Sequence, residues 1–341
     1  MSSDPLVSIV TPCLNPGERL VRCLDSVVAQ TYPHVEHVVV DAGSTDGTVD
    51  LLRERGVRFV SEPDDGQAQA INKGFGLANG TWLGWLNADD LLTPRSIELA
   101  MAAAARRPSA GWIYGQCEIR EGFEHSIYEP PARVDRRTVR ERNPLAQPGT
   151  LIARWALDRV GPLDEKLDLV MDFDLWLRLI DAAVPALYVP EVLAVFEIHA
   201  DSKTGSIPAR DWALEDAAAM LKRGHMSDGA LLLGRIAARS VHEFGSPIDR
   251  GRLEGEITDV IAYGRQLAPA LDETTVRASA YAEAAERELF APRRRYRYLF
   301  SPEAWRVSRT RRRLWSALAV RGVRFVALRA GRILRPFRGS S

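Results

Sequence analysis

The sequence predicts an α/β fold, with a mostly parallel central sheet that carries helices on both faces. Short runs rich in β-branched residues alternate with segments of helical periodicity, and this alternation is typical of doubly wound parallel sheets. Polar side chains follow two of the runs where a strand would end, which is where open α/β sheets bind ligands. The chain has 341 residues, 46% of them hydrophobic, so it can bury one large domain plus an appendage.

The first elements follow one another in a regular order. The run Val7–Pro12 predicts a short strand, and a loop separates it from a helical segment. A second apolar strand ends at Asp41, where turn-forming residues begin and where Asp46 can cap the next helix. We expect strands at residues 7–12, 35–40, 57–60 and from 82, and helices at residues 19–30, 46–53 and 67–78.

The fourth strand leads into the most informative residues of the chain. An apolar, aromatic-rich run that starts at Trp82 predicts a buried strand, and Asn87, Asp89 and Asp90 follow it. Unpaired carboxylates that leave a core cost free energy, which a bound cation would offset. Carboxylate oxygens together with substrate phosphates are the usual ligands of Mg²⁺ or Mn²⁺. The alternative is that an aspartate caps the following helix, but Thr93 can fill that position.

Two common nucleotide-binding folds are excluded by the glycine pattern. Asp41 at the end of the second strand would suit a dinucleotide fold, but that fold needs G-x-G-x-x-G after the first strand. The turn there contains only Gly17, and the similar Gly74-Phe75-Gly76 lies inside a predicted helix. The sequence contains no G-x-x-x-x-G-K-[ST] motif either, so hydride transfer and P-loop chemistry are not supported.

Two further acids begin an apolar helix in the second half of the chain. Asp172 and Asp174 lie two positions apart, so they do not share a helix face and cannot do the same job. In a purely structural interpretation, Asp172 caps the helix and Asp174 complements its dipole.

A histidine follows the apolar strand that starts at Val192. A lone histidine is more often a satisfied side chain than a ligand, but His199 shares its loop with Ser202 and Lys203. The segment Gln147–Thr150 precedes another strand, and its Pro-Gly pair predicts a turn.

Four segments that follow one another along the chain resemble the family 2 inverting glycosyltransferases, and most closely the bacterial enzymes of surface-polysaccharide assembly. The resemblance covers roughly residues 5–205 and implies the GT-A (nucleotide-diphospho-sugar transferase) fold, in which one domain binds a sugar nucleotide. The segments that carry it are Val7–Asn15, Val38–Thr48, Gly80–Asp90 and Gln147–Trp176.

The resemblance implies a set of nucleotide contacts. Thr11 and Pro12 would border the nucleoside, and Asp41 would accept a hydrogen bond from the base. Asn72 matches an asparagine of the family pattern near the nucleotide. Asn87 occupies the first position of the family's DXD motif, where it can accept a hydrogen bond from a ribose hydroxyl.

The same resemblance implies a metal and diphosphate site. Asp89 would bind Mn²⁺ or Mg²⁺, and Asp90 would contact the sugar or support the turn. His199 would be a second metal or diphosphate contact, and Lys203 a partner of the diphosphate. Gln147–Thr150 matches a segment near the acceptor.

The family pattern places its general base at Asp172, and Asp174 is the alternative. The base would take a proton from an acceptor hydroxyl that attacks the anomeric carbon from the face opposite the nucleotide. Three positions depart from the pattern. Asn87 is neutral where many relatives have Asp, Ile71 stands where many have Arg, and Met171 replaces a Glu.

Composition limits the cellular context. The three cysteines show no C-x-x-C spacing, which favours reduced thiols in the cytoplasm. The sequence shows no signal peptide and no run of 18 apolar residues, so we expect no membrane span. We predict a GT-A domain at residues 1–205, a helical extension at 206–292 and a basic amphipathic helical tail at 293–341.

The net charge of zero conceals a strongly basic tail. Residues 293–341 contain fifteen Arg and one acid, Glu303, which gives +14, so the remainder carries −14. Apolar residues recur at helical spacing from Trp315 to Ile333, with arginines opposite. Such a helix can lie in a membrane interface, or it can pack on the protein itself. The tail lacks a nucleic-acid-binding motif.

We therefore expect a metal-dependent inverting glycosyltransferase that uses a nucleoside-diphosphate sugar, with UDP the favoured nucleotide. Its acceptor would be a glycan or a lipid-linked glycan, and it would act at the inner face of the cell membrane. Two alternatives remain: a catalytically silent GT-A scaffold recruited by its tail, and a sugar-nucleotide pyrophosphorylase. The second would need a Gly-rich basic loop after the first strand, which the chain lacks.

Overall fold

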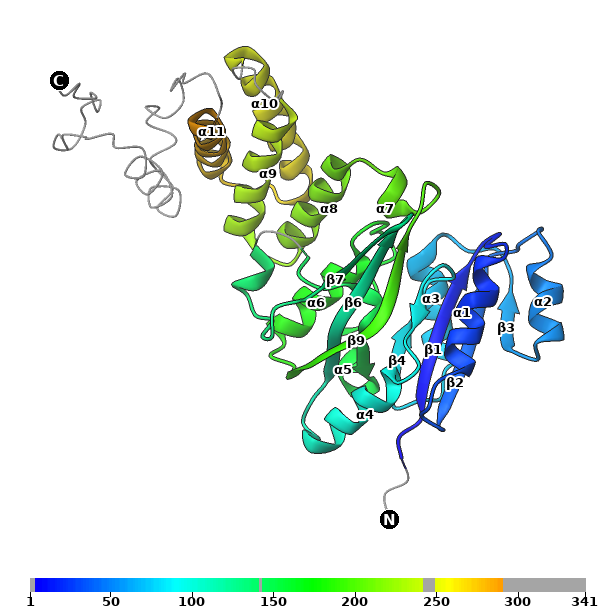
Figure 1. Cartoon of the computed structure of the whole chain (residues 1–341). Helices are drawn as coiled ribbons and strands as arrows, with labels where there is room; N and C mark the ends of the chain where they lie inside the picture. The colour runs from blue at the N-terminus through cyan, green and yellow to red at the C-terminus, as the bar shows by residue number, and fades with distance from the viewer. Residues whose placement is uncertain (1–3, 141–142, 242–248, 291–341) are drawn as a thin grey trace, which may run out of the picture. The chain divides into compact units, whose positions relative to one another are not determined.

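A computed structural model describes residues 4–140, 143–241 and 249–290 (Figure 1). The chain divides into two compact units, Met1–Ile207 and Pro208–Ser341. The first unit is an α/β domain and the described part of the second is helical, as expected between residues 208 and 290. No helix in the described ranges is long and apolar enough to cross a membrane.

The first unit is built on a nine-stranded sheet in the order β3-β2-β1-β4-β8-β6-β9-β5, with β7 paired to β6. Its N-terminal half is parallel, because β2 and β4 both pair with β1 in parallel and β3 continues from β2. The longest pairing, between β6 and β9, is parallel too, whereas β5, β7 and β8 run antiparallel to their neighbours. The strands are β1 (Val7–Cys13), β2 (Val35–Asp41), β3 (Arg58–Ser61), β4 (Trp82–Trp85), β5 (Leu91–Leu92), β6 (Trp112–Glu121), β7 (Glu124–Tyr128), β8 (Leu151–Ala153) and β9 (Ala186–Ile198).

Helices of this unit cover both faces of the sheet. Thr11 of β1 contacts Cys23 of α1 (Oγ1 to Sγ, 3.8 Å). The neighbouring Val10 packs directly against Gly74 of α3, so closely that a Cβ atom at Gly74 would clash with it. Successive strand residues point to opposite faces, so α1 and α3 lie on opposite sides of β1. The longer helices are α1 (Arg19–Val28), α2 (Thr48–Glu54), α3 (Gln67–Leu77), α4 (Ser96–Arg106), α5 (Arg154–Val160) and α6 (Met171–Asp181).

Most predicted elements are confirmed, with one local correction. The predicted role of Thr93 as a helix cap is wrong, because α4 begins at Ser96 and the hydroxyl of Thr93 donates to Val192 O at 2.8 Å. The hydroxyl therefore joins the end of β5 to β9 instead of satisfying the helix. Asp46 does accept from the backbone N–H of Thr48 at the start of α2, at 3.1 Å.

The second unit contains four described helices. Two of these helices approach closely at Gly234. A Cβ atom at this position would lie only 2.3 Å from the backbone oxygen of Val276, so the contact requires a glycine. The helices are α8 (Ala209–Lys222), α9 (Met226–Ser240), α10 (Arg250–Leu267) and α11 (Glu273–Phe290). The predicted tail at residues 293–341 lies outside the described residues.

One arginine fixes the end of α3, the helix that follows β3. The guanidinium of Arg154 donates to Ala78 O at 2.7 Å, to Gly80 O at 2.9 Å and to Phe75 O at 3.4 Å. These carbonyls lie at the C-terminal end of α3 and in the turn after it, where the helix leaves its last carbonyls without internal partners. Arg154 thus holds α3 against the start of α5.

Arg154→Ala should therefore lower the free energy of unfolding by about 2 kcal/mol, because three carbonyls lose a charged donor. Denaturant titration followed by circular dichroism measures this change. Arg159→Ala is the matched control, since Arg159 is an exposed arginine of the same helix. Equal stability of the two variants would contradict the role of Arg154 in fixing α3.

Candidate active site

An acid and a histidine meet where β4 and β9 end. Asp89 Oδ2 lies 3.0 Å from His199 Nε2, and the two side chains are 26% and 22% exposed. The other ring nitrogen of His199, Nδ1, is buried without a hydrogen-bond partner among the described residues. The contact joins residues 110 positions apart, so the fold brings together two groups that the sequence only suggested.

Asn87 and Asp90 form the turn that presents Asp89. Asp90 is fully buried and accepts hydrogen bonds from Asn87 Nδ2 at 3.0 Å and from the backbone N–H of Glu197 at 3.1 Å. Burial and the adjacent charge of Asp89 raise the pKa of Asp90 well above its usual range. The Asn87 amide oxygen accepts from Gln67 Nε2 at 2.7 Å. Asp90 therefore supports the turn, and Asn87 connects it to α3.

Asp41 closes β2 inside a ring of donors. It accepts from the backbone N–H groups of Gly43 and Ser44 and from the hydroxyls of Ser44 and Ser61. Burial acts to raise the pKa of Asp41, but the hydrogen bonds from Ser44 and Ser61 outweigh it and hold the pKa below its usual range. An ionised acceptor thus lies at the carboxyl end of β2.

Thr11 and Pro12 lie beside this strand end, in register with Val39 and Val40 of β2. Thr11 Oγ1 is 2.9 Å from His37 Nε2, and burial lowers the pKa of His37 to about 4, so that imidazole is neutral near pH 7.

Asn72 does not point at the end of β2. Its amide nitrogen donates to Leu163 O at 3.0 Å and to Glu165 Oε1 at 2.9 Å, while its oxygen accepts from Leu163 N at 2.9 Å. These bonds tie α3 to the loop that precedes α6. The structure thus gives Asn72 a scaffolding role, and its nucleotide contact stays a prediction.

The two acids of α6 have different environments. Asp174 is fully buried and pairs with Arg178 Nε at 2.9 Å, whose guanidinium also donates to Val160 O and Gly161 O. Asp172 is only partly buried, and its Oδ2 accepts from Asn143 Nδ2 at 2.7 Å. Asp172 is not the N-cap, because α6 begins at Met171 after Val170, but its Oδ1 accepts from the backbone N–H of Phe173 at 2.7 Å within the first turn. Asp174 therefore serves packing, and Asp172 is the more accessible acid.

A stack of indoles places α6 against the end of β4. The ring of Trp176 stacks on Trp85 at 6.0 Å and on Trp112 at 5.3 Å between centroids. Asp172 precedes Trp176 by four positions, so both project from the same helix face. Trp85 ends β4, two residues before Asn87. The stack therefore fixes α6 against β4 and β6, with Asp172 one helical turn before Trp176.

Lys203 makes a second connection between these segments. Its ammonium donates to Asp168 Oδ1 at 2.6 Å and to Asp168 O at 2.8 Å. Asp168 lies in the loop just before α6, so this ion pair joins the segment after His199 to the helix of Asp172. The predicted contact of Lys203 with a diphosphate is not tested by this arrangement.

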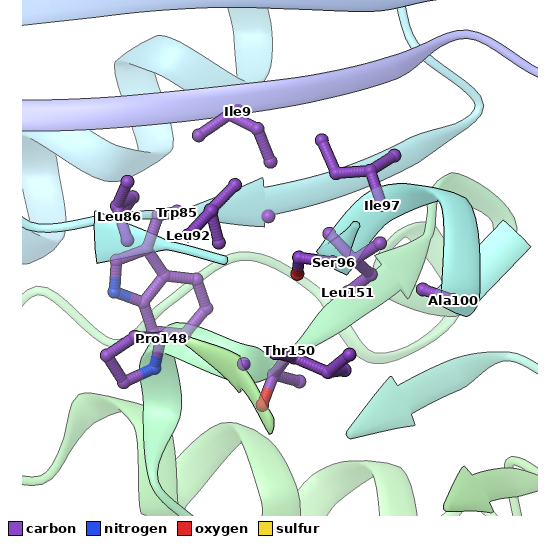
Figure 2. Close-up of a pocket in the computed structure, with 13 residues that line it drawn as sticks. Ile9, Trp85, Leu86, Leu92, Ser96, Ile97, Ala100, Pro148, Thr150 and Leu151 are labelled. Atoms are coloured by element: carbon purple, nitrogen blue, oxygen red, sulfur yellow. The ribbon is translucent and has the colours of Figure 1, made fainter. Parts of the chain in front are cut away.

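A small apolar cavity lies beneath the strand end (Figure 2). Trp85 and Leu86 line it from β4 and the turn that follows, opposite the 3₁₀ turn η2 (Gln147–Gly149). None of its thirteen lining residues is titratable, so it belongs to the core under the site. The turn predicted at Pro148-Gly149 is confirmed, and Gln147 Nε2 donates to Trp85 O at 2.7 Å.

Some neighbours of the candidate site gave no signal in the sequence. Asn143 and Gln67 are ordinary polar residues in loop and helix positions, and only the fold shows that they hold Asp172 and Asn87. Asp168 likewise looked like a loop acid. No group of three or more His, Cys, Asp or Glu among the described residues could hold a metal ion by itself.

The mixed sheet with helices on both faces is a fold of GT-A type, and comparison with known proteins agrees. Residues 8–153 match the family described as Glycosyl transferase family 2. A structure of Staphylococcus aureus TarS in complex with UDP-GlcNAc superposes with a TM-score of 0.56 at 14% identity, covering 81% of this chain and 91% of that one. This likeness concerns the fold alone.

Curated relatives are glycosyltransferases of bacteria. An uncharacterized glycosyltransferase of Rickettsia prowazekii is 29% identical over 60% of this chain and 67% of its own length. Chondroitin synthase of Escherichia coli is 36% identical over 32% of this chain but only 17% of its own length. A mycobacterial PGL/p-HBAD biosynthesis glycosyltransferase is 37% identical over 34% of this chain and 48% of its own length. Residues 8–153 therefore match a family 2 glycosyltransferase domain, and the relatives similar to this chain are named glycosyltransferases.

Substitution of the two acids of α6 should lower stability by different amounts. Asp174→Asn should lower the free energy of unfolding by about 3 kcal/mol, because it leaves the buried guanidinium of Arg178 without its counter-charge. Asp172→Asn should cost less than about 1 kcal/mol, since Asp172 is partly solvated and the amide can still hydrogen-bond. Denaturant titration of the two variants compares them, and a larger loss for Asp172→Asn would reverse these assignments.

Proposed function

We propose that this glycosyltransferase moves a sugar from a nucleoside diphosphate to a glycan or lipid-linked acceptor, with inversion at the anomeric carbon. One observation supports the proposal: Trp176, one helical turn after Asp172, stacks on Trp85, which ends the strand before the turn where Asp89 meets His199. A donor held at the strand end would then have a carboxylate available on its acceptor side. A bacterial surface polysaccharide is the product class that the sequence resemblance implies.

Asp172 would be the general base. It would take the proton of the acceptor hydroxyl as that oxygen forms a bond to the anomeric carbon, and the bond to the diphosphate would break with its electron pair. A single displacement inverts the centre and requires no nucleophilic carboxylate on the enzyme. The hydrogen bond from Asn143 to Asp172 Oδ2 supports this role, because it orients the carboxylate.

Asp89 and His199 would hold a divalent ion. A carboxylate and an imidazole suit Mn²⁺ as well as Mg²⁺, and the unpartnered Nδ1 of His199 leaves the ring nitrogens open to a change of tautomer. Two protein ligands leave room for diphosphate oxygens. The bound ion would supply positive charge that stabilises the departing diphosphate. Asn87 adds no charge, so Asp89 would carry the metal contact of that turn.

The nucleotide would lie at the ends of β1 and β2. Asp41 is ionised and would accept from a base N–H, with Thr11 and Pro12 alongside. We favour UDP as the nucleotide, because the TarS structure with the same fold was solved with UDP-GlcNAc. Lys203 would release Asp168 and bind the diphosphate instead.

Donor hydrolysis tests the proposal and separates it from a silent scaffold. The intact chain with Mn²⁺ should slowly hydrolyse at least one sugar nucleotide of a panel, and the matching donor should raise the melting temperature. Asp172→Asn should reduce transfer about a hundredfold or more while the donor still raises the melting temperature. Asp89→Asn should abolish the Mn²⁺-dependent part of that rise.

Two results would contradict the proposal. If donor binding falls together with transfer, Asp172 is a structural residue and not the base. If no donor of the panel is hydrolysed or bound, the catalytic proposal is wrong and the scaffold interpretation stands.

The basic tail would hold the enzyme at the inner face of the membrane. Fifteen arginines in residues 293–341 would attract an anionic leaflet, each contributing on the order of 1 kcal/mol near its surface. This segment lies outside the described residues, so its sequence alone supports the idea.

A chain that ends at residue 292 should therefore sediment less with phosphatidylglycerol vesicles than the full chain, while donor hydrolysis is kept. Vesicles of neutral lipid are the control. Unchanged sedimentation would show that the tail packs on the protein instead.

A further inference from the structure

A basic segment after β7, residues 130–140, contacts the helix of the proposed base. Between Pro130 and Arg140 the sequence contains four Arg and one Asp. Arg133 and Arg136 expose 86% and 67% of their side chains, and Arg137 is exposed as well. We call the surface formed by Arg133, Arg136, Arg137 and Asn143 the arginine strap.

The strap is firmly attached to the domain. At its start the hydroxyl of Tyr114 donates to Pro131 O at 2.9 Å, and at its end the hydroxyl of Tyr128 donates to Pro144 O at 3.0 Å. Between these points Val134 and Val139 are buried, at 8% and 1% exposure. The charged side chains therefore stand on a fixed backbone.

Residues of the strap contact both ends of α6. Arg136 pairs with Asp181, the last residue of α6, at 2.8 Å, and Asn143 donates to Asp172 at its first turn. A helix rises 1.5 Å per residue, so the two contacts are about 13 Å apart along the axis. The arginines thus lie well away from the acid that would take the proton.

Charge on the strap is not fully neutralised within the domain. Arg133 pairs with Asp135 at 3.5 Å, and Asp135 is also used by the backbone N–H groups of Arg137 and Thr138. Arg136 pairs with Asp181, whereas the Arg137 side chain has the charge of Asp135 nearby but makes no hydrogen bond or ion pair among the described residues. Planar guanidinium groups on a fixed backbone are well suited to carboxylate or phosphate oxygens.

Resting on the function proposed above, we propose that the arginine strap binds the acceptor, and that the acceptor is an anionic oligosaccharide bearing carboxylate or phosphate groups. The reacting hydroxyl would lie at Asp172, and a charged unit further along the chain would lie on Arg133, Arg136 and Arg137. The 13 Å span excludes a single neutral sugar as the unit that the strap recognises.

The test uses the full chain, Mn²⁺ and a sugar nucleotide that the enzyme hydrolyses, together with three oligosaccharides of equal length. These are an oligogalacturonate hexamer, phosphorylated maltohexaose and neutral maltohexaose. The anionic hexamers should either accept sugar or inhibit donor hydrolysis, at concentrations at least about tenfold below those needed with maltohexaose. Sugar transfer and donor hydrolysis both occur at the catalytic site, so a hexamer bound only to the basic tail changes neither rate.

The triple variant Arg133→Gln, Arg136→Gln, Arg137→Gln should remove most of this preference, raising the half-effective concentration of the anionic hexamers about tenfold. The matched control is Arg106→Gln, Arg107→Gln, Arg159→Gln, which makes the same charge change on α4 and α5 and should leave the preference intact. Melting temperatures of both variants check that they are folded. Added salt should weaken the preference in the wild type.

Three outcomes would overturn the proposal. An equal response of the triple variant and its control would show that the strap does not select the acceptor, although donor hydrolysis would leave the proposed function standing. If the triple variant no longer sediments with phosphatidylglycerol vesicles, but its half-effective concentration for the anionic hexamers is unchanged, the strap is a membrane contact. Absence of donor hydrolysis in the wild type would remove both proposals together.

Discussion

The candidate site depends on the packing of one side chain, Trp176. Its ring lies against both Trp85 of β4 and Trp112 of β6, so α6 is fixed across two strands at once. Each such aromatic pair contributes about 0.5–1.5 kcal/mol beyond the area it buries. Trp176 Nε1 is buried without a hydrogen-bond partner among the described residues, a cost of about 1–3 kcal/mol. Aromatic packing therefore holds the helix in place despite an unsatisfied polar group.

That constraint lets neighbouring acids have separate roles. On α6, Asp174 pairs with Arg178 inside the core, whereas the partly exposed Asp172 accepts from Asn143 at the first turn. At the end of β4, Asp90 is buried in the turn and Asp89 stays accessible beside His199. In both pairs one acid stabilises the backbone that presents the other. The same separation explains a neutral Asn87, because its amide can donate to Asp90 where a carboxylate would repel it.

The sequence predicted the fold and the strand ends well, because both depend on local patterns. Alternating apolar runs determine strands and helices, and the acids after Trp85 stand out against a buried strand. The partners of these acids could not be predicted in the same way. Asn143 meets Asp172 from 29 positions away, and Lys203 meets Asp168 from 35, through loops without periodicity. Asn72 resembled a nucleotide contact, yet its amide is bound to the loop at Leu163.

The positions of α6 and the strap suggest how donor and acceptor are kept apart. The candidate donor contacts come from β1, β2 and β4, the parallel half of the sheet whose carboxyl ends face one edge. The candidate acceptor contacts come from α6 and the segment after β7. The indole stack, the Lys203–Asp168 ion pair and the bonds of Asn72 to the loop before α6 are among the contacts that join the two sets. The proposed acceptor residues Arg133 and Arg136 are exposed, so they can change in sequence without disturbing the packing at the ends of β1 and β2. Such a division would let related enzymes keep one donor chemistry while they select different glycans.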